Sequence, residues 1–170
     1  MGLSARRSNQ ENIHEDSRSY LKVLYVNYMY LYDMNSAINY FNSITPPQNK
    51  KFNLYYNIMY VINCVNKSDK EEAVNKRDSL MIAYPNNKNI RNIERTITAY
   101  FTLNEIENIK ALYPIDKGLE IKKIINAHFL MTYYKIRNND VEAKFYAQFV
   151  IDNAKDLNGI ITEAKSVIES

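Results

Sequence analysis

The chain has 170 residues, of which 46% are hydrophobic and 24% charged, with a formal net charge of +3. This length fits one domain or one short array of repeats, and the charge is too small and too scattered for a nucleic-acid-binding surface. The chain has only 3 Gly and 4 Pro, which are too few to form the many turns between strands that a β fold needs. We therefore expect an all-α protein without a nucleic-acid partner. The frequent Asn, Ile, Lys and Tyr are typical of an AT-rich bacterial genome.

The first 16 residues are polar, and we interpret residues 1–16 as a flexible lead-in to a single helical domain over residues 17–170. Such a polar opening does not fit a signal peptide. No segment reaches the ~18 uninterrupted apolar residues that a membrane span requires. We therefore predict a cytoplasmic protein, or the cytosolic part of a membrane-anchored one.

Helical periodicity continues along almost the whole of the remaining chain. The breaks fall at "TPPQNK", at "PNNKN" and at Pro114, because proline cannot continue a helix. Ser68 and Glu71 form a capping box, Asp140 can cap a later helix, and Gly159 suits a left-handed helix end. The predicted helices span about 17–32, 35–44, 52–66, 68–84, 90–102, 104–112, 118–137, 140–157 and 160–168.

Successive pairs of predicted helices lie roughly 35 residues apart. A fixed period of this size, with two helices in each unit, is typical of a solenoid. We predict a right-handed solenoid of about four antiparallel helix hairpins with an amphipathic C-terminal capping helix.

The first predicted helix is apolar on every side between residues 20 and 32. A helix wedged between its partner and a neighbouring hairpin has no solvent face, and such a composition is then expected. We predict that Tyr25 and Tyr28 lie in the core. At the open end of the stack, Val23, Val26 and Tyr30 need a cover: the lead-in, a second copy of the chain, or preceding sequence.

A small residue recurs near the start of the second helix in three units, as Ala37, Ala73 and Ala143. Tyr28 and Tyr134 precede two of these alanines by nine residues. In this pattern the units resemble tetratricopeptide repeats, whose period is 34. The resemblance implies a curved solenoid whose inner wall, built from the first helix of each hairpin, binds a protein or peptide.

By the geometry of that family, the inner wall would draw on residues from three of the predicted helices. These residues are Lys22, Val26, Met29, Tyr30, Tyr55, Ile58, Ile62, Asn66, His128, Thr132 and Lys135. Tyrosine gives rigid area with a polar tip, and asparagine can pair with both backbone groups of a peptide. Core packing explains Tyr30 and Tyr55 equally well.

Arg91 and Arg95 share one face of a predicted helix and could bind an acidic peptide or a carboxylate. The alternative is two ordinary surface arginines on an amphipathic helix.

The sequence contains no catalytic or metal-binding motif. His14 lies in the polar lead-in, and His128 stands alone in the apolar segment "IINAHFLM", where we expect a core or groove residue with a satisfied ring. Cys64 lies in the apolar run "YVINCV" and is expected to be a small buried hydrophobe. We predict no enzyme activity, no metal and no cofactor.

The predicted function is that of a non-enzymatic helical-repeat module that binds a protein or peptide. Two alternatives remain open. The chain could be a soluble regulatory or tail domain of a larger, membrane-anchored bacterial protein, or it could form a homodimer through its first helix.

Overall fold

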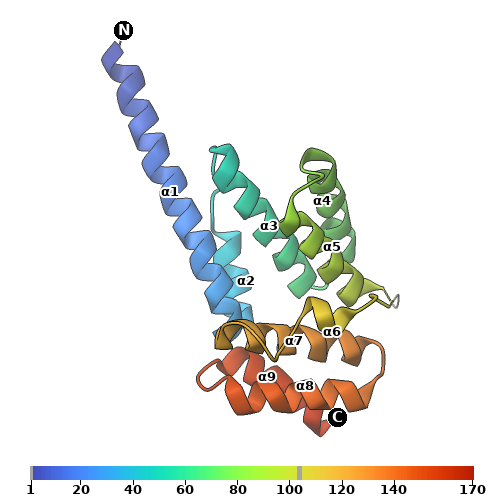
Figure 1. Cartoon of the computed structure of the whole chain (residues 1–170). Coiled ribbons are helices and arrows are strands. Elements are labelled where there is room, and N and C mark those ends of the chain that lie inside the picture. Colours follow the sequence, from blue (N-terminus) through green and yellow to red (C-terminus); the bar gives the residue numbers. More distant parts are fainter. Residues whose placement is uncertain (1, 103–104) are drawn as a thin grey trace. The chain divides into compact units, whose positions relative to one another are not determined.

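The computed structural model describes the backbone of residues 2–102 and 105–170 and the side chains from residue 14 onward (Figure 1). Within these residues the regular structure is entirely helical, which confirms the all-α prediction. The helices are α1 (Gly2–Tyr32), α2 (Met34–Asn42), α3 (Lys50–Asn66), α4 (Lys70–Ala83), α5 (Lys88–Phe101), α6 (Ile109–Leu112), α7 (Glu120–Ile136), α8 (Asp140–Asn153) and α9 (Asn158–Glu169).

The chain divides into two compact units, each with its own core. The first unit comprises Met1–Tyr30 and Met34–Ile93, and the second comprises Leu31–Asp33 and Glu94–Ser170. In the first unit α3 packs on α4 and on α2, and in the second α8 packs on α7 and on α9. The prediction of a single domain over residues 17–170 stays a prediction.

Helix α1 begins at Gly2, well before the predicted start near Ser17. Asp16, the last residue of the predicted lead-in, holds the start of α3 in place. Its carboxylate accepts hydrogen bonds from the backbone N–H groups of Gln48 (2.7 Å) and Asn49 (2.8 Å). Donors near a helix N-terminus have no intrahelical partner, so an acceptor on α1 fixes the proline-containing connection that leads into α3.

The core of the first unit corrects the prediction for α1. Val23, Val26 and Tyr30 are buried against Phe41 of α2 and Met59 of α3, so the chain's own helices supply the cover that they need. The predicted core positions of Tyr25 and Tyr28 are wrong, because these side chains are 58% and 62% exposed. The apolar stripe that faces solvent therefore lies on the other side of α1.

A buried hydrogen bond joins α1 to α3 inside this core. The hydroxyl of Tyr30 donates to Oδ1 of Asn63 at 2.9 Å, and Nδ2 of Asn63 donates to Oδ1 of Asn42 at 3.3 Å. Asn63 is 1% exposed, so its amide depends on these partners instead of water. Burial also raises the pKa of Tyr30, which keeps the hydroxyl protonated as a donor.

Three consecutive helices recur along the chain with a constant offset. Helices α7, α8 and α9 begin at residues 120, 140 and 158, each 70 residues after the start of α3, α4 and α5 at residues 50, 70 and 88. The lengths agree as well: α3 and α7 have 17 residues, and α4 and α8 have 14. An offset of 70 is twice the period of roughly 35 read from the sequence.

The turns between α3 and α4 and between α7 and α8 also match. Each has a left-handed residue, Ser68 (φ 60°) or Asn138 (φ 54°). The next residue caps the following helix, with Asp69 accepting from the N–H of Glu72 and Asn139 accepting from that of Glu142. The predicted caps at Ser68 and Asp140 are therefore each displaced by one residue.

The core of the second unit consists of buried side chains from α5 to α9. Small residues let its helices approach closely, and the larger ones fill the space between them. Its fully buried members include Ala127, Leu130, Met131, Ala143, Ala147, Val150, Ile160 and Ala164. Helix α9 buries Ile160, Ala164 and Val167 in this core, as an amphipathic terminal helix should.

Gly159 has a different role from the predicted one. It lies in the first turn of α9, and the left-handed residue of the preceding turn is Lys155 (φ 47°). A Cβ atom added to Gly159 would stand 2.9 Å from the carbonyl oxygen of Leu31 and 2.9 Å from the carbonyl carbon of Tyr32. Glycine is required here because another segment's backbone approaches closely.

Replacing Gly159 with alanine tests this close approach. In an ordinary helix the change Gly159→Ala would stabilise the protein by about 0.5–1 kcal/mol. Because the added methyl group meets backbone atoms, we expect the opposite sign, with a loss of about 1–3 kcal/mol. Urea denaturation followed by circular dichroism gives the value, and Ser166→Ala on the exposed face of α9 is the control. Increased stability of Gly159→Ala would contradict the packing.

The Tyr30–Asn63 hydrogen bond can be tested with a matched pair of variants. Tyr30→Phe leaves the buried Asn63 amide without its donor, and we expect a loss of about 1–2 kcal/mol in the free energy of unfolding. Tyr28→Phe removes a hydroxyl from an exposed tyrosine of the same helix and should change stability by less than about 0.5 kcal/mol. Chemical denaturation of both variants measures the difference; equal effects would refute the assignment.

Candidate functional site

The predicted binding residues of the first unit differ in accessibility. Val26, Tyr30 and Ile58 are buried in the core, so they offer little surface to a partner. The half-buried members are Lys22, Met29, Tyr55, Ile62 and Asn66, and Arg91 is exposed. The aromatic contact of Tyr55 with Tyr20, at 5.5 Å between ring centroids, accords with the core-packing alternative for this residue.

In the second unit, the predicted residues of α7 belong to a polar cluster. Nε2 of His128 lies 2.6 Å from Oε2 of Glu163 on α9, and Oγ1 of Thr132 donates to the His128 carbonyl at 3.1 Å. Burial raises the pKa of the neighbouring Tyr100 to about 12. His128 is thus a half-buried residue with a satisfied ring, as predicted. Lys135 is exposed, and Arg95 is half-buried.

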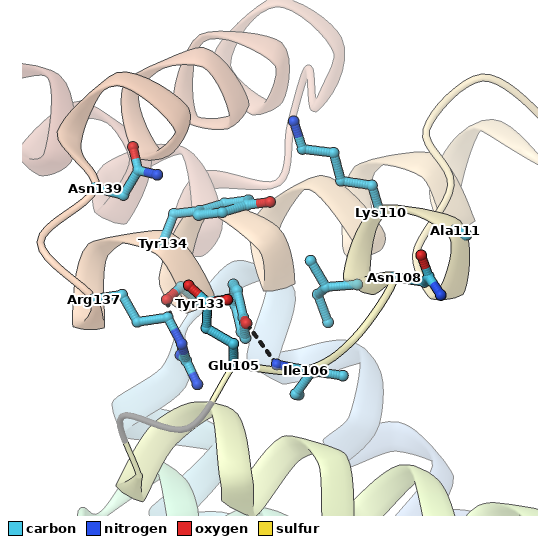
Figure 2. A pocket seen from close by; sticks show the side chains of 10 residues that line it. Glu105, Ile106, Asn108, Lys110, Ala111, Tyr133, Tyr134, Arg137 and Asn139 are labelled. Atoms are coloured by element: carbon cyan, nitrogen blue, oxygen red, sulfur yellow. Dashed lines mark hydrogen bonds between the residues drawn. The ribbon is translucent and has the colours of Figure 1, made fainter.

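A pocket of about 500 Å³ lies where the loop before α6, α6 itself and the C-terminal end of α7 meet (Figure 2). Its walls combine aliphatic, aromatic, amide and charged groups. The lining residues are Glu105, Ile106, Asn108, Ile109, Lys110, Ala111, Tyr133, Tyr134, Arg137 and Asn139.

One wall of the pocket is held by Tyr133 and Arg137. The backbone N–H of Ile106 donates to the Tyr133 hydroxyl at 2.8 Å, which fixes the loop before α6 onto α7 (Figure 2). The Arg137 guanidinium lies 3.7 Å from the centre of the Tyr133 ring, as in a cation–π contact. It also donates to the carbonyls of Tyr133 (3.1 Å), Ala99 (3.4 Å) and Thr102 (3.3 Å), and so ties the ends of α5 and α7 together.

The opposite rim carries Tyr134 and Lys110. The Tyr134 ring stacks on Tyr146 of α8, with 5.8 Å between centroids and 2° between planes. Nζ of Lys110 lies 2.7 Å from Oε1 of Glu142 and 5.8 Å from the centre of the Tyr134 ring. The hydrogen bond to Glu142 raises the pKa of Lys110, and burial raises that of Tyr134. At neutral pH the rim therefore holds a charged ammonium beside a neutral phenol.

Both cationic side chains of the pocket have partners within the second unit. Lys110 is paired with Glu142, and the Arg137 guanidinium donates to carbonyl groups. Across the described side chains, no three of His, Cys, Asp and Glu lie close enough to hold a metal ion. Ile106, Ile109 and Ala111 give an apolar wall, Asn108 lies on the same side of the pocket, and Asn139 lines the pocket at the turn into α8.

Sequence reasoning missed this pocket because it lies at the end of α7. The predicted residues His128, Thr132 and Lys135 follow one face of that helix, whereas the pocket uses the last turn and the loops around it. The adjacent tyrosines at 133 and 134 and the "NND" break were the available signals. These signals indicate a pocket only once α6 is known to bring Ile109 and Lys110 next to the C-terminal end of α7.

Comparisons with protein-family models, with curated proteins and with solved structures find no match for this chain. Of the helices described, none combines the length and the apolarity needed to cross a lipid bilayer.

The role of Arg137 leads to a prediction on stability. Replacing it with glutamine removes the donors to the ends of α5 and α7, and we expect a loss of about 2 kcal/mol, since hydrogen bonds from a charged group are among the stronger ones. Lys135→Gln removes the same charge from an exposed position nearby and should have little effect. Thermal and urea denaturation measure both. A null result for Arg137→Gln would show that these contacts do not hold the pocket.

Proposed function

We propose that this chain is a non-enzymatic helical-repeat module that binds a protein or peptide partner. The observation that carries the proposal is the pocket between α6 and α7, which would receive an apolar side chain of the partner. We further propose that the helix pairs form a right-handed, tetratricopeptide-like solenoid with α9 as its terminal cap.

The repeat proposal is supported by the constant offset of 70 residues between two sets of three helices. The equivalence extends to side chains in the interior. Ala73 and Ala143, which are 70 residues apart, are 0% and 1% exposed, and Ile90 and Ile160 are 2% and 1% exposed. Equivalent buried positions at a fixed spacing are what a chain built from repeated units requires.

The nature of the ligand follows from the pocket walls. Ile106, Ile109 and Ala111 offer apolar contact, and the Tyr134 ring adds a flat surface beside them. Asn108 has an amide that makes no capping bond, so it can pair with the N–H and C=O groups of an extended peptide. A volume of about 500 Å³ accommodates one large side chain and its backbone. Lys110 and Glu142 form an ion pair, so their charges cancel and they do not favour a strongly charged ligand.

The proposal is tested with peptides selected from a random library displayed on phage, using the full chain as bait. We expect Ala111→Phe, which fills the pocket from an exposed position, to weaken binding of the selected peptides about tenfold or more. Tyr134→Ala should act in the same direction. Fluorescence polarisation with labelled peptides measures the dissociation constants.

The control is Phe145→Ala, which removes an exposed aromatic side chain of α8 outside the pocket. It should leave peptide affinity unchanged. Selected peptides that bind Ala111→Phe as tightly as the unmodified chain, or a selection that yields no binder, would count against the pocket as the binding site.

A further inference from the structure

Helix α1 carries two apolar stripes on nearly opposite sides. The first consists of Val23, Val26 and Tyr30, all of which are buried. The second, which we call the outer stripe, consists of Leu21, Leu24, Tyr25 and Tyr28. Leu21, Tyr25 and Tyr28 each follow or precede a core residue by two positions, and two residues turn an α-helix by about 200°. The outer stripe therefore lies on the side of α1 away from the buried stripe, and only the edge of the Tyr25 ring meets α2, at 5.9 Å from the ring centre of Tyr40.

The outer stripe is exposed along its length. Leu21 is 63% exposed, Leu24 38%, Tyr25 58% and Tyr28 62%. A helix of a globular protein normally turns a polar face to solvent, and one that is apolar on every side is normally covered. Contiguous exposed apolar surface on this scale marks an interaction site.

The spacing of the outer stripe identifies the kind of partner. Leu21, Tyr25 and Tyr28 are separated by four and then three residues, which is the spacing of the contact positions in a coiled coil. This seam fits another helix with the same seam, and the chain itself supplies one. No charged side chain belongs to the stripe, so two copies can meet there without repulsion between like charges.

We propose that the outer stripe of α1 pairs with the outer stripe of a second copy, with the two helices antiparallel. An antiparallel pair centred between Leu24 and Tyr25 places Leu21 of each copy opposite Tyr28 of the other. A parallel pair would instead place the exposed Arg18 beside its own copy at the end of the seam. A twofold axis closes either arrangement, but the antiparallel one sends the two guanidinium groups to opposite ends.

The area agrees with a reversible dimer. The four side chains of the outer stripe each expose on the order of 100 Å². Together with the aliphatic parts of neighbouring side chains, the two copies would bury on the order of 1,000 Å² in total. This is near the lower limit for a specific interface, so the dimer should dissociate on dilution. The interface lies on α1 of the first unit and does not use the peptide pocket of the second, so each proposal can fail without the other.

The first experiment measures self-association by sedimentation equilibrium across micromolar to millimolar concentrations. We expect the unmodified chain to dimerise, and the double variant Leu21→Glu/Tyr28→Glu to associate at least about tenfold more weakly. The control is Ile82→Glu on α4, which adds a charge at a position that is 84% exposed and should leave the dimer intact. The proposal would be overturned if the unmodified chain were monomeric at every concentration. It would also be overturned if the double variant still dimerised, or if the Ile82→Glu control weakened the dimer as much as the double variant does.

The second experiment reports orientation and does not depend on the folding of the charged variant. Single cysteines are introduced as Leu21→Cys and Tyr28→Cys in a Cys64→Ser background, and disulfide formation is followed under mild oxidation. The antiparallel pair requires the mixture of the two variants to cross-link faster than either variant alone. Faster cross-linking of Leu21→Cys with itself would indicate parallel helices, and no cross-linking beyond that of an Ile82→Cys control would overturn the interface.

Discussion

The turn between two packed helices sets the geometry of each unit. At Ser68 and at Asn138 the backbone enters the left-handed region, which reverses the chain within a few residues, and the next residue caps the new helix with its side chain. The buried alanines at 73 and 143 follow four residues after each cap. A larger side chain at these positions would separate the helices, so the alanine and the turn together fix how closely the two helices approach.

The pocket in the second unit follows from this turn. Because α7 stops at Ile136, its last carbonyl groups need donors from outside the helix. Backbone N–H groups of the turn serve Tyr134 and Lys135, and the Arg137 side chain serves the Tyr133 carbonyl while also reaching the end of α5. The same guanidinium covers the Tyr133 ring, whose hydroxyl in turn accepts a hydrogen bond from the loop before α6. Arg137 and Tyr133 together thus join three segments, and the pocket lies beside them. The pocket therefore lies where helices end, not along a helix face.

The sequence predicted the class and the order of the helices, because apolar periodicity and proline breaks are local signals. It did not predict the start of α1, since the polar residues before Ser17 carry no periodicity. The caps were displaced by one residue because Ser68 and Asp69 are both good capping residues, and the choice between them depends on the left-handed turn. The pocket could not be predicted, because it depends on α6, a single helical turn that packs near a distant part of the chain. The resemblance to tetratricopeptide repeats stays a hypothesis.

The error at α1 has a physical cause that also gives it meaning. In a helix that is apolar on every side, periodicity cannot indicate which stripe faces the core, so Tyr25 and Tyr28 could not be distinguished from Val26 and Tyr30 by pattern alone. The structure distinguishes them by volume and partners: the valines fit against Phe41, and Tyr30 finds a hydrogen-bond acceptor in Asn63. Tyr28, with its polar tip, tolerates water better than valine would. A tyrosine-rich outer stripe therefore tolerates water better than a valine-rich one would and still offers apolar surface, as the proposed dimer requires.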